Sequence, residues 1–209
     1  MADVVRFYFS FRSPYSWLAM YRMNLIRDEL SVEMEMIPVF PAGDKNDLIL
    51  SDQNKVKYIA SDVDRLASAY RLAIQWPKPF DTDWLAVHIA YIYAAEQGKG
   101  MAFCLVVYAA RFIEGKDVGG EEIKRELADR CGLDTDTLIG AQEKREYKKK
   151  LLQGMAQAGK ESVFGVPFFR YKKTSYWGND RLEWLVREIN HDSGMDIPDL
   201  STDPFKRPY

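Results

Sequence analysis

The sequence predicts an α/β domain that is made from two separate stretches of chain and interrupted by an all-helical insertion. Three observations support this. The first 40 residues follow a strand–helix–strand pattern, the long middle region contains only helical patterns, and the residues from 166 to 190 return to strand, strand and helix. The chain has 209 residues, of which 47% are apolar. This is enough to bury a core in one large domain or in one domain with an insertion.

The amino-terminal stretch begins with β-branched and aromatic residues at 4–9, which predict a strand. Ser13 followed by Pro14 is a helix-start signal, because serine is a favoured N-cap and proline is tolerated in the first helical position. We therefore expect a helix over 15–29 and a second strand over 31–39, joined by a right-handed crossover. The expected apolar stripe of the helix consists of Leu18, Tyr21 and Leu25.

Apolar residues at helical spacing predict helices through the middle of the chain. The expected ranges are 53–73, 83–97, 101–114, 121–131, 134–139 and 142–158, and Asp134 is expected to cap the fifth of them. The carboxyl-terminal stretch predicts strands at 166–171 and 174–177, a turn at Lys172 and Lys173, and a helix over 181–190.

These elements give the order βαβ–ββα, which is the order of a thioredoxin-like fold with a helical insertion. The predicted boundaries place the α/β domain in residues 1–45 and 160–192, the insertion in 46–159, and a carboxyl-terminal arm in 193–209.

Composition argues against several classes of function. The net charge is −2, so no overall basic field favours nucleic acid. Cys104 and Cys131 form neither a disulfide framework nor a CxxC motif, and only two histidines are available for a metal site. The longest apolar run is ten residues, about half of what a bilayer span needs. We expect a cytoplasmic protein with no membrane segment, no bound metal and no nucleic-acid partner.

The segment Ser13-Pro14-Tyr15-Ser16 lies where a thioredoxin-like fold would carry its dithiol motif. Serine at both ends excludes dithiol exchange at this position. A helix amino terminus still favours an anion, because it presents free N–H groups and the positive end of the helix dipole. Taken alone, the motif favours a plain N-cap followed by proline over an anion-binding role.

Three segments together resemble one family. They are residues 7–19 (FYFSFRSPYSWLA), residues 55–62 (KVKYIASD), and the pair 165–169 (GVPFF) and 177–182 (WGNDRL). The combination is similar to 2-hydroxychromene-2-carboxylate isomerases and kappa-class glutathione transferases, and it spans almost the whole chain. The resemblance implies a thioredoxin-like fold with an insertion, and glutathione as cofactor.

The resemblance also implies roles for individual residues. The hydroxyl of Ser13 would hydrogen-bond the glutathione sulfur and stabilise its thiolate. Val166 would present its backbone to the cysteinyl part of glutathione, next to a cis bond at Pro167. The alternative for Pro167 is a trans proline at the start of a strand.

Three further residues match the family's binding segments. Asn179 and Asp180 would hold the γ-glutamyl end of glutathione, and Asp180 could also cap the last helix. Lys55 would lie near the glycyl end or a substrate carboxylate; its alternative is a solvated helix face. The family usually has an asparagine in the loop before this helix, and either Asp44 or Asn46 takes that place here.

Candidate substrate-binding residues are weaker: Arg12, Tyr15, Asp44, Asn46 and Trp177. For Arg12, a solvated loop position is the favoured alternative to a role beside the thiolate. His88, within an apolar helix, is expected to be a buried histidine with satisfied hydrogen bonds.

The expected function is a glutathione-dependent isomerase acting on a small aromatic or hydrophobic electrophile. The alternatives are a kappa-class-like glutathione transferase and a non-catalytic thioredoxin-like binding protein. The resemblance also implies a homodimer.

Overall fold

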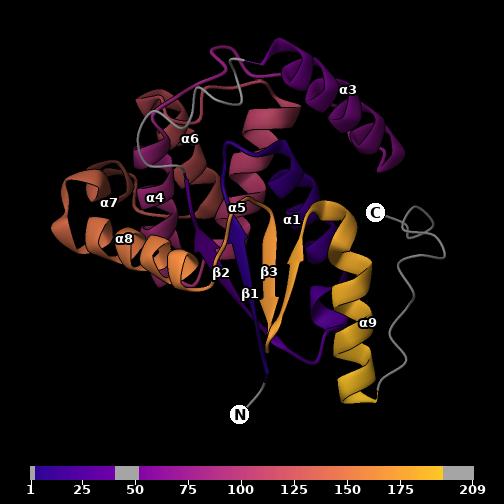
Figure 1. Ribbon diagram of the computed structural model, residues 1–209. Coiled ribbons are helices and arrows are strands. Elements are labelled where there is room, and N and C mark those ends of the chain that lie inside the picture. Colours follow the sequence, from indigo (N-terminus) through magenta and orange to yellow (C-terminus); the bar gives the residue numbers. More distant parts are fainter. Residues whose placement is uncertain (1–2, 41–51, 195–209) are drawn as a thin grey trace.

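The computed structural model describes residues 3–40 and 52–194 (Figure 1). The first stretch forms β1 (Val4–Phe9), α1 (Pro14–Ile26) and β2 (Glu33–Pro38). The last stretch forms β3 (Phe168–Tyr171), β4 (Thr174–Trp177) and α9 (Leu182–Ser193). Between β2 and β3, the described residues form six α-helices: α3 (Gln53–Ala69), α4 (Trp84–Glu96), α5 (Gly100–Tyr108), α6 (Glu121–Cys131), α7 (Thr135–Gly140) and α8 (Arg145–Lys160). The predicted βαβ–ββα order with a helical insertion is confirmed.

The four strands form a mixed sheet in the order β2-β1-β3-β4. β1 and β2 are parallel, and β3 runs antiparallel to both β1 and β4. Tyr8 is paired with Ile37 on one side and with Phe168 on the other. The end of β1 therefore lies beside the start of β3.

The two faces of the sheet bury different sets of residues. Phe7, Phe9 and Phe169 belong to a large core cluster that also includes residues of α1, α4, α5 and α9. The rings of Phe7 and Phe169 stack with centroids 4.5 Å apart. On the opposite face, a smaller cluster joins Tyr8 and Ile37 to Ala158 of α8. Figure 1 shows α8 on the β2 side of the sheet and α9 on the β4 side.

Several predicted helix boundaries differ from the structure. The helix expected over 53–73 ends at Ala69, since Arg71 adopts a positive φ of 57°. The helix expected over 101–114 changes to a π-helical turn at Ala109–Ile113. In α1, Tyr21 and Leu25 are only half-buried, and Arg22 on another face is buried. Across the described ranges, no helix has both the length and the apolar character needed to cross a bilayer.

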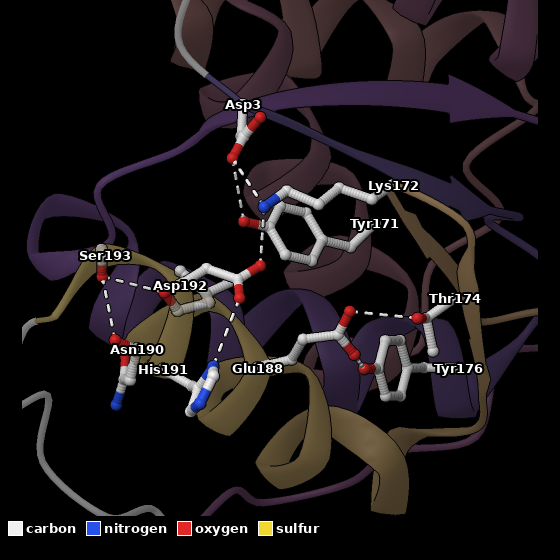
Figure 2. Close-up of polar contacts among 11 residues, drawn as sticks. Asp3, Tyr171, Lys172, Thr174, Tyr176, Glu188, Asn190, His191, Asp192 and Ser193 are labelled. Atoms are coloured by element: carbon white, nitrogen blue, oxygen red, sulfur yellow. Dashed lines mark hydrogen bonds and ion pairs between the residues drawn. The ribbon is translucent and has the colours of Figure 1, made fainter.

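The β3–β4 hairpin is fastened to α9 and to the amino terminus at one end of the sheet (Figure 2). Lys172, in the turn, forms ion pairs with Asp3 at 3.1 Å and with Asp192 at 2.7 Å. Glu188 of α9 accepts hydrogen bonds from Thr174 and from the Tyr176 hydroxyl. These contacts fix α9 against the edge strand.

A buried histidine connects the insertion to the loop after β1. His88 of α4 has no exposed surface, and its Nδ1 lies 2.6 Å from the carbonyl oxygen of Trp84. Its Nε2 accepts from the backbone N–H of Phe11 at 3.3 Å and lies 3.4 Å from the hydroxyl of Ser10. Both ring nitrogens are therefore satisfied, as predicted. Burial lowers the pKa of His88 to about 4, so the ring is neutral at pH 7.

Two glycines of α8 provide a matched test of its contact with the sheet. A Cβ added at Gly154 would lie 2.9 Å from Cγ2 of Ile37, whereas one added at Gly159 would meet nothing within 4 Å. We expect Gly159→Ala to stabilise the protein by about 0.5–1 kcal/mol through its higher helix propensity. Gly154→Ala should be less stable than Gly159→Ala by at least about 1 kcal/mol. Equal free energies of unfolding in urea would contradict the close contact.

The buried imidazole predicts a specific loss of stability in acid. The folded pKa of His88 is lowered from 6.5 to about 4, so between these values the unfolded chain binds more protons than the folded chain. Stability from this group is present above pH 6.5 and falls as the pH decreases. From pH 7.5 to pH 5 the loss should be about 2 kcal/mol. It can be measured by urea unfolding of the wild type and His88→Gln, which lacks the titrating group. Parallel pH dependence in the two proteins would refute the assignment.

Candidate functional site

Three segments that are distant in the sequence meet at one end of the sheet. Ser13 follows the end of β1, and Pro167 immediately precedes β3, whose first residue pairs with Tyr8. The N–H of Gly178 donates to the carbonyl oxygen of Pro167 at 2.9 Å, so the segment after β4 lies there as well. The segments that carry the family resemblance at the two ends of the chain are therefore brought together.

Ser13 is the N-cap of α1. Its Oγ accepts a hydrogen bond from the N–H of Ser16 at 3.1 Å, and Pro14 occupies the first helical position. Capping uses a lone pair of the hydroxyl oxygen and leaves its proton available for another acceptor. The N–H of Tyr15 has no acceptor within residues 3–40 and 52–194. No acidic side chain lies in the first turn of α1, so this end can bind an anion.

The loop that leads into Ser13 is buried and hydrogen-bonded from several directions. The carbonyl oxygen of Ser10 accepts from the N–H of Ser13 at 3.0 Å and from the hydroxyl of Tyr108 at 2.9 Å. The N–H of Ser10 donates to Oγ of Ser16 at 3.4 Å. Together with His88, these contacts attach the loop to α1, α4 and α5.

Arg12 is not the solvated loop residue that the sequence favoured. Its side chain is 12% exposed, and Nε lies 3.3 Å from Oδ1 of Asp81. Asp81 also accepts a hydrogen bond from the indole of Trp84. Asp81, which lies before α4, thus provides the partner that the charge of Arg12 requires when water is largely excluded.

A second arginine lies nearby, in the π-helical turn of the insertion. Arg111 is fully buried, donates to the carbonyl oxygen of Phe80 at 2.8 Å, and stacks over the ring of Trp84 at 4.5 Å. Burial lowers its pKa to about 10, and the charges of Asp81 and Arg12 also act on it. It remains protonated at neutral pH.

The bond between Val166 and Pro167 is cis, as predicted. Val166 is half-buried, and within the described ranges its N–H and its C=O have no hydrogen-bond partner. Both groups belong to backbone that lies beside the start of β3, so they could pair with an extended peptide-like ligand.

Asn179 and Asp180 have different surroundings. Asn179 is buried. Its side-chain amide donates to the hydroxyl of Tyr70 at 3.1 Å, and its backbone carbonyl oxygen accepts from Arg22 at 2.7 Å. Asp180 is exposed and lies beside Arg181 at 3.0 Å. It belongs to a short 3₁₀ turn (Asn179–Arg181) and makes no capping bond to α9, so the predicted capping role is wrong.

Tyr15 connects α1 to α3, and this contact orients the insertion over the site. Its hydroxyl donates to Asp62 at 2.8 Å, and Tyr70, just after α3, stacks with Arg22. The two helices therefore run in the same direction, and the start of α3 extends past Ser13. Lys55 is exposed there, two turns before Asp62 and roughly 10 Å from it along the helix axis. Asp44 and Asn46 lie outside the described residues.

Trp177 ends β4 and is 54% exposed. Its ring packs edge-on against Phe164 at 4.9 Å, and its indole nitrogen would be 2.8 Å from a Cβ added at Gly165. It therefore lies against the segment that leads to Val166, on the same face as Phe168.

The chain's own sulfur atoms are not at this site. Cys104 and Cys131 are both buried, and burial raises the pKa of each thiol. Thiols in this state are poor nucleophiles. Among the described residues at the start of α1, two polar groups could contact a reacting sulfur. They are the hydroxyl of Ser13 and the N–H of Tyr15.

The contacts behind Ser13 were not predicted from the sequence. Tyr108 and Arg111 lie in the stretch expected to form a helix over 101–114, whose first ten residues are all apolar. A buried tyrosine or arginine needs a hydrogen-bond partner inside the protein. The presence of these two residues in an apolar helix therefore indicated that such partners exist. Their partners at Ser10 and Phe80 are remote in the sequence, so they could not be named in advance.

Comparisons with known proteins agree with this geometry. The model of the family described as "DSBA-like thioredoxin domain" matches residues 4–190. The 2-hydroxychromene-2-carboxylate isomerase of Sphingobium xenophagum is 28% identical over 192 residues, covering 88% of this chain and 97% of the relative. The isomerase of the same name from Pseudomonas putida is 24% identical, covering 87% and 92%.

A solved structure of a 2-hydroxychromene-2-carboxylate isomerase superposes with a TM-score of 0.76 at 21% identity, covering 93% of this chain and all of that one. This likeness establishes the thioredoxin-like fold with its insertion between β2 and β3. The family model spans the sheet, the insertion and the last helix alike. The chain belongs to the family of DSBA-like thioredoxin domains and is distantly homologous to the 2-hydroxychromene-2-carboxylate isomerases.

Proposed function

We propose that this protein is a glutathione-dependent isomerase acting on a small aromatic electrophile, with Ser13 as the residue that stabilises the glutathione thiolate. The single observation behind the proposal is the state of Ser13. Its oxygen caps α1, its proton is available, and it lies at the same end of the sheet as the cis Val166–Pro167 bond. The near full-length homology to isomerases supports the reaction class.

The groups at the site fit glutathione in three respects. The hydroxyl of Ser13 and the N–H of Tyr15 can donate to a thiolate. The free N–H and C=O of Val166 match the backbone of a cysteinyl residue. The exposed carboxylate of Asp180 and the ammonium of Lys55 offer opposite charges for the amino and carboxylate ends of the tripeptide.

When bound, glutathione would supply a nucleophilic sulfur for reversible addition to an electrophilic carbon of the substrate. Ser13 would donate its proton in a hydrogen bond to this sulfur, and Tyr15 would donate its N–H. The positive helix end, Arg12 and Arg111 would add favourable charge. Together these groups would lower the pKa of the thiol and orient it.

The proposal requires that activity follow glutathione. The purified protein should isomerise a 2-hydroxychromene-2-carboxylate only when glutathione is added, and glutathione alone should raise the melting temperature. A conjugation assay with a halogenated aromatic compound separates this function from a glutathione transferase. No binding and no thermal shift would reject both enzymes and leave a non-catalytic binding protein.

Substitutions of Ser13 separate its capping role from its role toward the thiol. Ser13→Ala should lose about 1 kcal/mol of stability with the cap, and its turnover should fall roughly 10²-fold with the hydrogen-bond donor. Ser13→Asp keeps the cap but places a negative charge beside the sulfur. It should therefore unfold at the same urea concentration as the wild type and fail to bind glutathione in calorimetry. Retained binding by Ser13→Asp would contradict the thiolate role.

The neighbours Asn179 and Asp180 should respond in opposite ways. Asn179→Ala removes the two hydrogen bonds of the Asn179 side chain, one to the hydroxyl of Tyr70 and one from Arg22, so we expect a loss of about 1–3 kcal/mol in unfolding free energy. Asp180→Asn removes an exposed charge and should leave stability unchanged while weakening glutathione binding roughly tenfold. Calorimetric titration and thermal unfolding of both variants measure the two effects. Unchanged affinity in Asp180→Asn would remove this residue from the binding site.

A further inference from the structure

We propose that His88 is a positioning residue for the thiol site, which holds the loop before Ser13 by accepting a hydrogen bond from the N–H of Phe11. The inference rests on the proposed function, because the group whose environment it sets is the bound thiol. His88 lies in the insertion and does not reach the helix end itself. Its effect would pass through the backbone of residues 10–13.

The hydrogen bonds of His88 define which of its nitrogens carries the proton. Nδ1 lies 2.6 Å from the carbonyl oxygen of Trp84, and a carbonyl oxygen can only accept, so Nδ1 is protonated. A backbone N–H can only donate, so Nε2, 3.3 Å from the nitrogen of Phe11, must have a free lone pair. A single neutral tautomer satisfies both contacts. The lowered pKa of the buried ring agrees with this state.

The N–H of Phe11 has few alternatives to this acceptor. Phe11 is fully buried, and its ring lies 5.2 Å from that of His88. Phe40 lies on the same imidazole at 5.2 Å, so the surroundings of the ring are apolar. Without an acceptor at position 88, this N–H would remain buried and unpaired, a state that favours movement of the loop.

Movement of the loop would reach Ser13 directly. Phe11 is two residues before Ser13, and Ser10 contacts His88 through its hydroxyl while its carbonyl oxygen accepts from the N–H of Ser13. Tyr108 holds the same carbonyl oxygen from α5. The orientation of the Ser13 hydroxyl and of the Tyr15 N–H therefore depends on contacts from the insertion, and small displacements of such donors weaken their effect on a bound group.

The test compares three variants of the full-length chain with the wild type. His88→Leu removes the acceptor, and His88→Gln supplies a carbonyl oxygen of similar reach. Ile89→Ala perturbs the neighbouring, equally buried residue, whose side chain cannot hydrogen-bond the loop. The thiolate absorbance of bound glutathione, followed against pH, gives the pKa of the thiol in each protein. Amide NMR resonances of Phe11 and Ser13, recorded without glutathione, report the loop.

We expect the thiolate fraction of bound glutathione to fall roughly tenfold in His88→Leu, at pH values below the thiol pKa, and to recover in His88→Gln. Ile89→Ala should unfold more easily and leave the thiol unchanged. The Phe11 resonance should move in His88→Leu and return in His88→Gln. If His88→Leu binds glutathione with an unaltered thiol pKa, the inference is overturned while the proposed function stands.

Two other outcomes also decide the matter. Failure of the wild type to bind glutathione overturns the proposed function, and the inference falls with it. If His88→Leu does not fold, the nitrogen-15 resonance of Nε2 in the wild type still provides a test. A protonated Nε2 is incompatible with acceptance from Phe11 and would overturn the inference, whereas an unprotonated Nε2 together with a normal thiol pKa in His88→Gln supports it.

Discussion

The structure depends on one constraint: the loop between β1 and α1 is buried, so its backbone polar groups need partners inside the protein. Ser10 is 3% exposed and Phe11 is fully buried. Water cannot satisfy their N–H and C=O groups, and leaving such groups unpaired costs about 1–3 kcal/mol each. The first helix supplies some partners through Ser13 and Ser16. The remainder come from α4 and α5, which lie about 80 to 100 residues later in the chain.

The helical insertion therefore supplies hydrogen-bond partners that the start of α1 and the loop before it require. The α/β domain alone would leave several of these polar groups unpaired. His88 and Tyr108 satisfy the loop, Asp81 neutralises Arg12, and Asp62 accepts from Tyr15. Each contact joins the insertion to a residue within five positions of Phe11. The opposite end of the sheet is fixed separately by the ion pairs of Lys172. The end of the sheet that carries Ser13 is therefore stabilised by contacts from the insertion. The end that carries the β3–β4 turn is stabilised by contacts with α9 and Asp3.

Features with a local cause could be predicted from the sequence, whereas features caused by remote contacts could not. Ser13 and Pro14 determine the start of α1 by themselves, and the cap formed as expected. The low exposure of Arg12 depends on Asp81, which is 69 positions away in the sequence. The side-chain amide of Asn179 donates a hydrogen bond to Tyr70, which is 109 positions away. The early end of α3 also had no signal, since Arg71 adopts a positive φ without being glycine.

The burial of both cysteines affects how the protein is damaged by electrophiles and oxidants. Electrophiles attack thiolates, and both thiols of this chain are shielded and protonated. If the working sulfur belongs to glutathione, irreversible oxidation or alkylation at the site destroys one small molecule, which then dissociates and is replaced. An enzyme that carried its own cysteine at the start of α1 would be lost with each such event. With serine at position 13 and glutathione as the proposed source of sulfur, the most vulnerable atom of the reaction would be exchangeable.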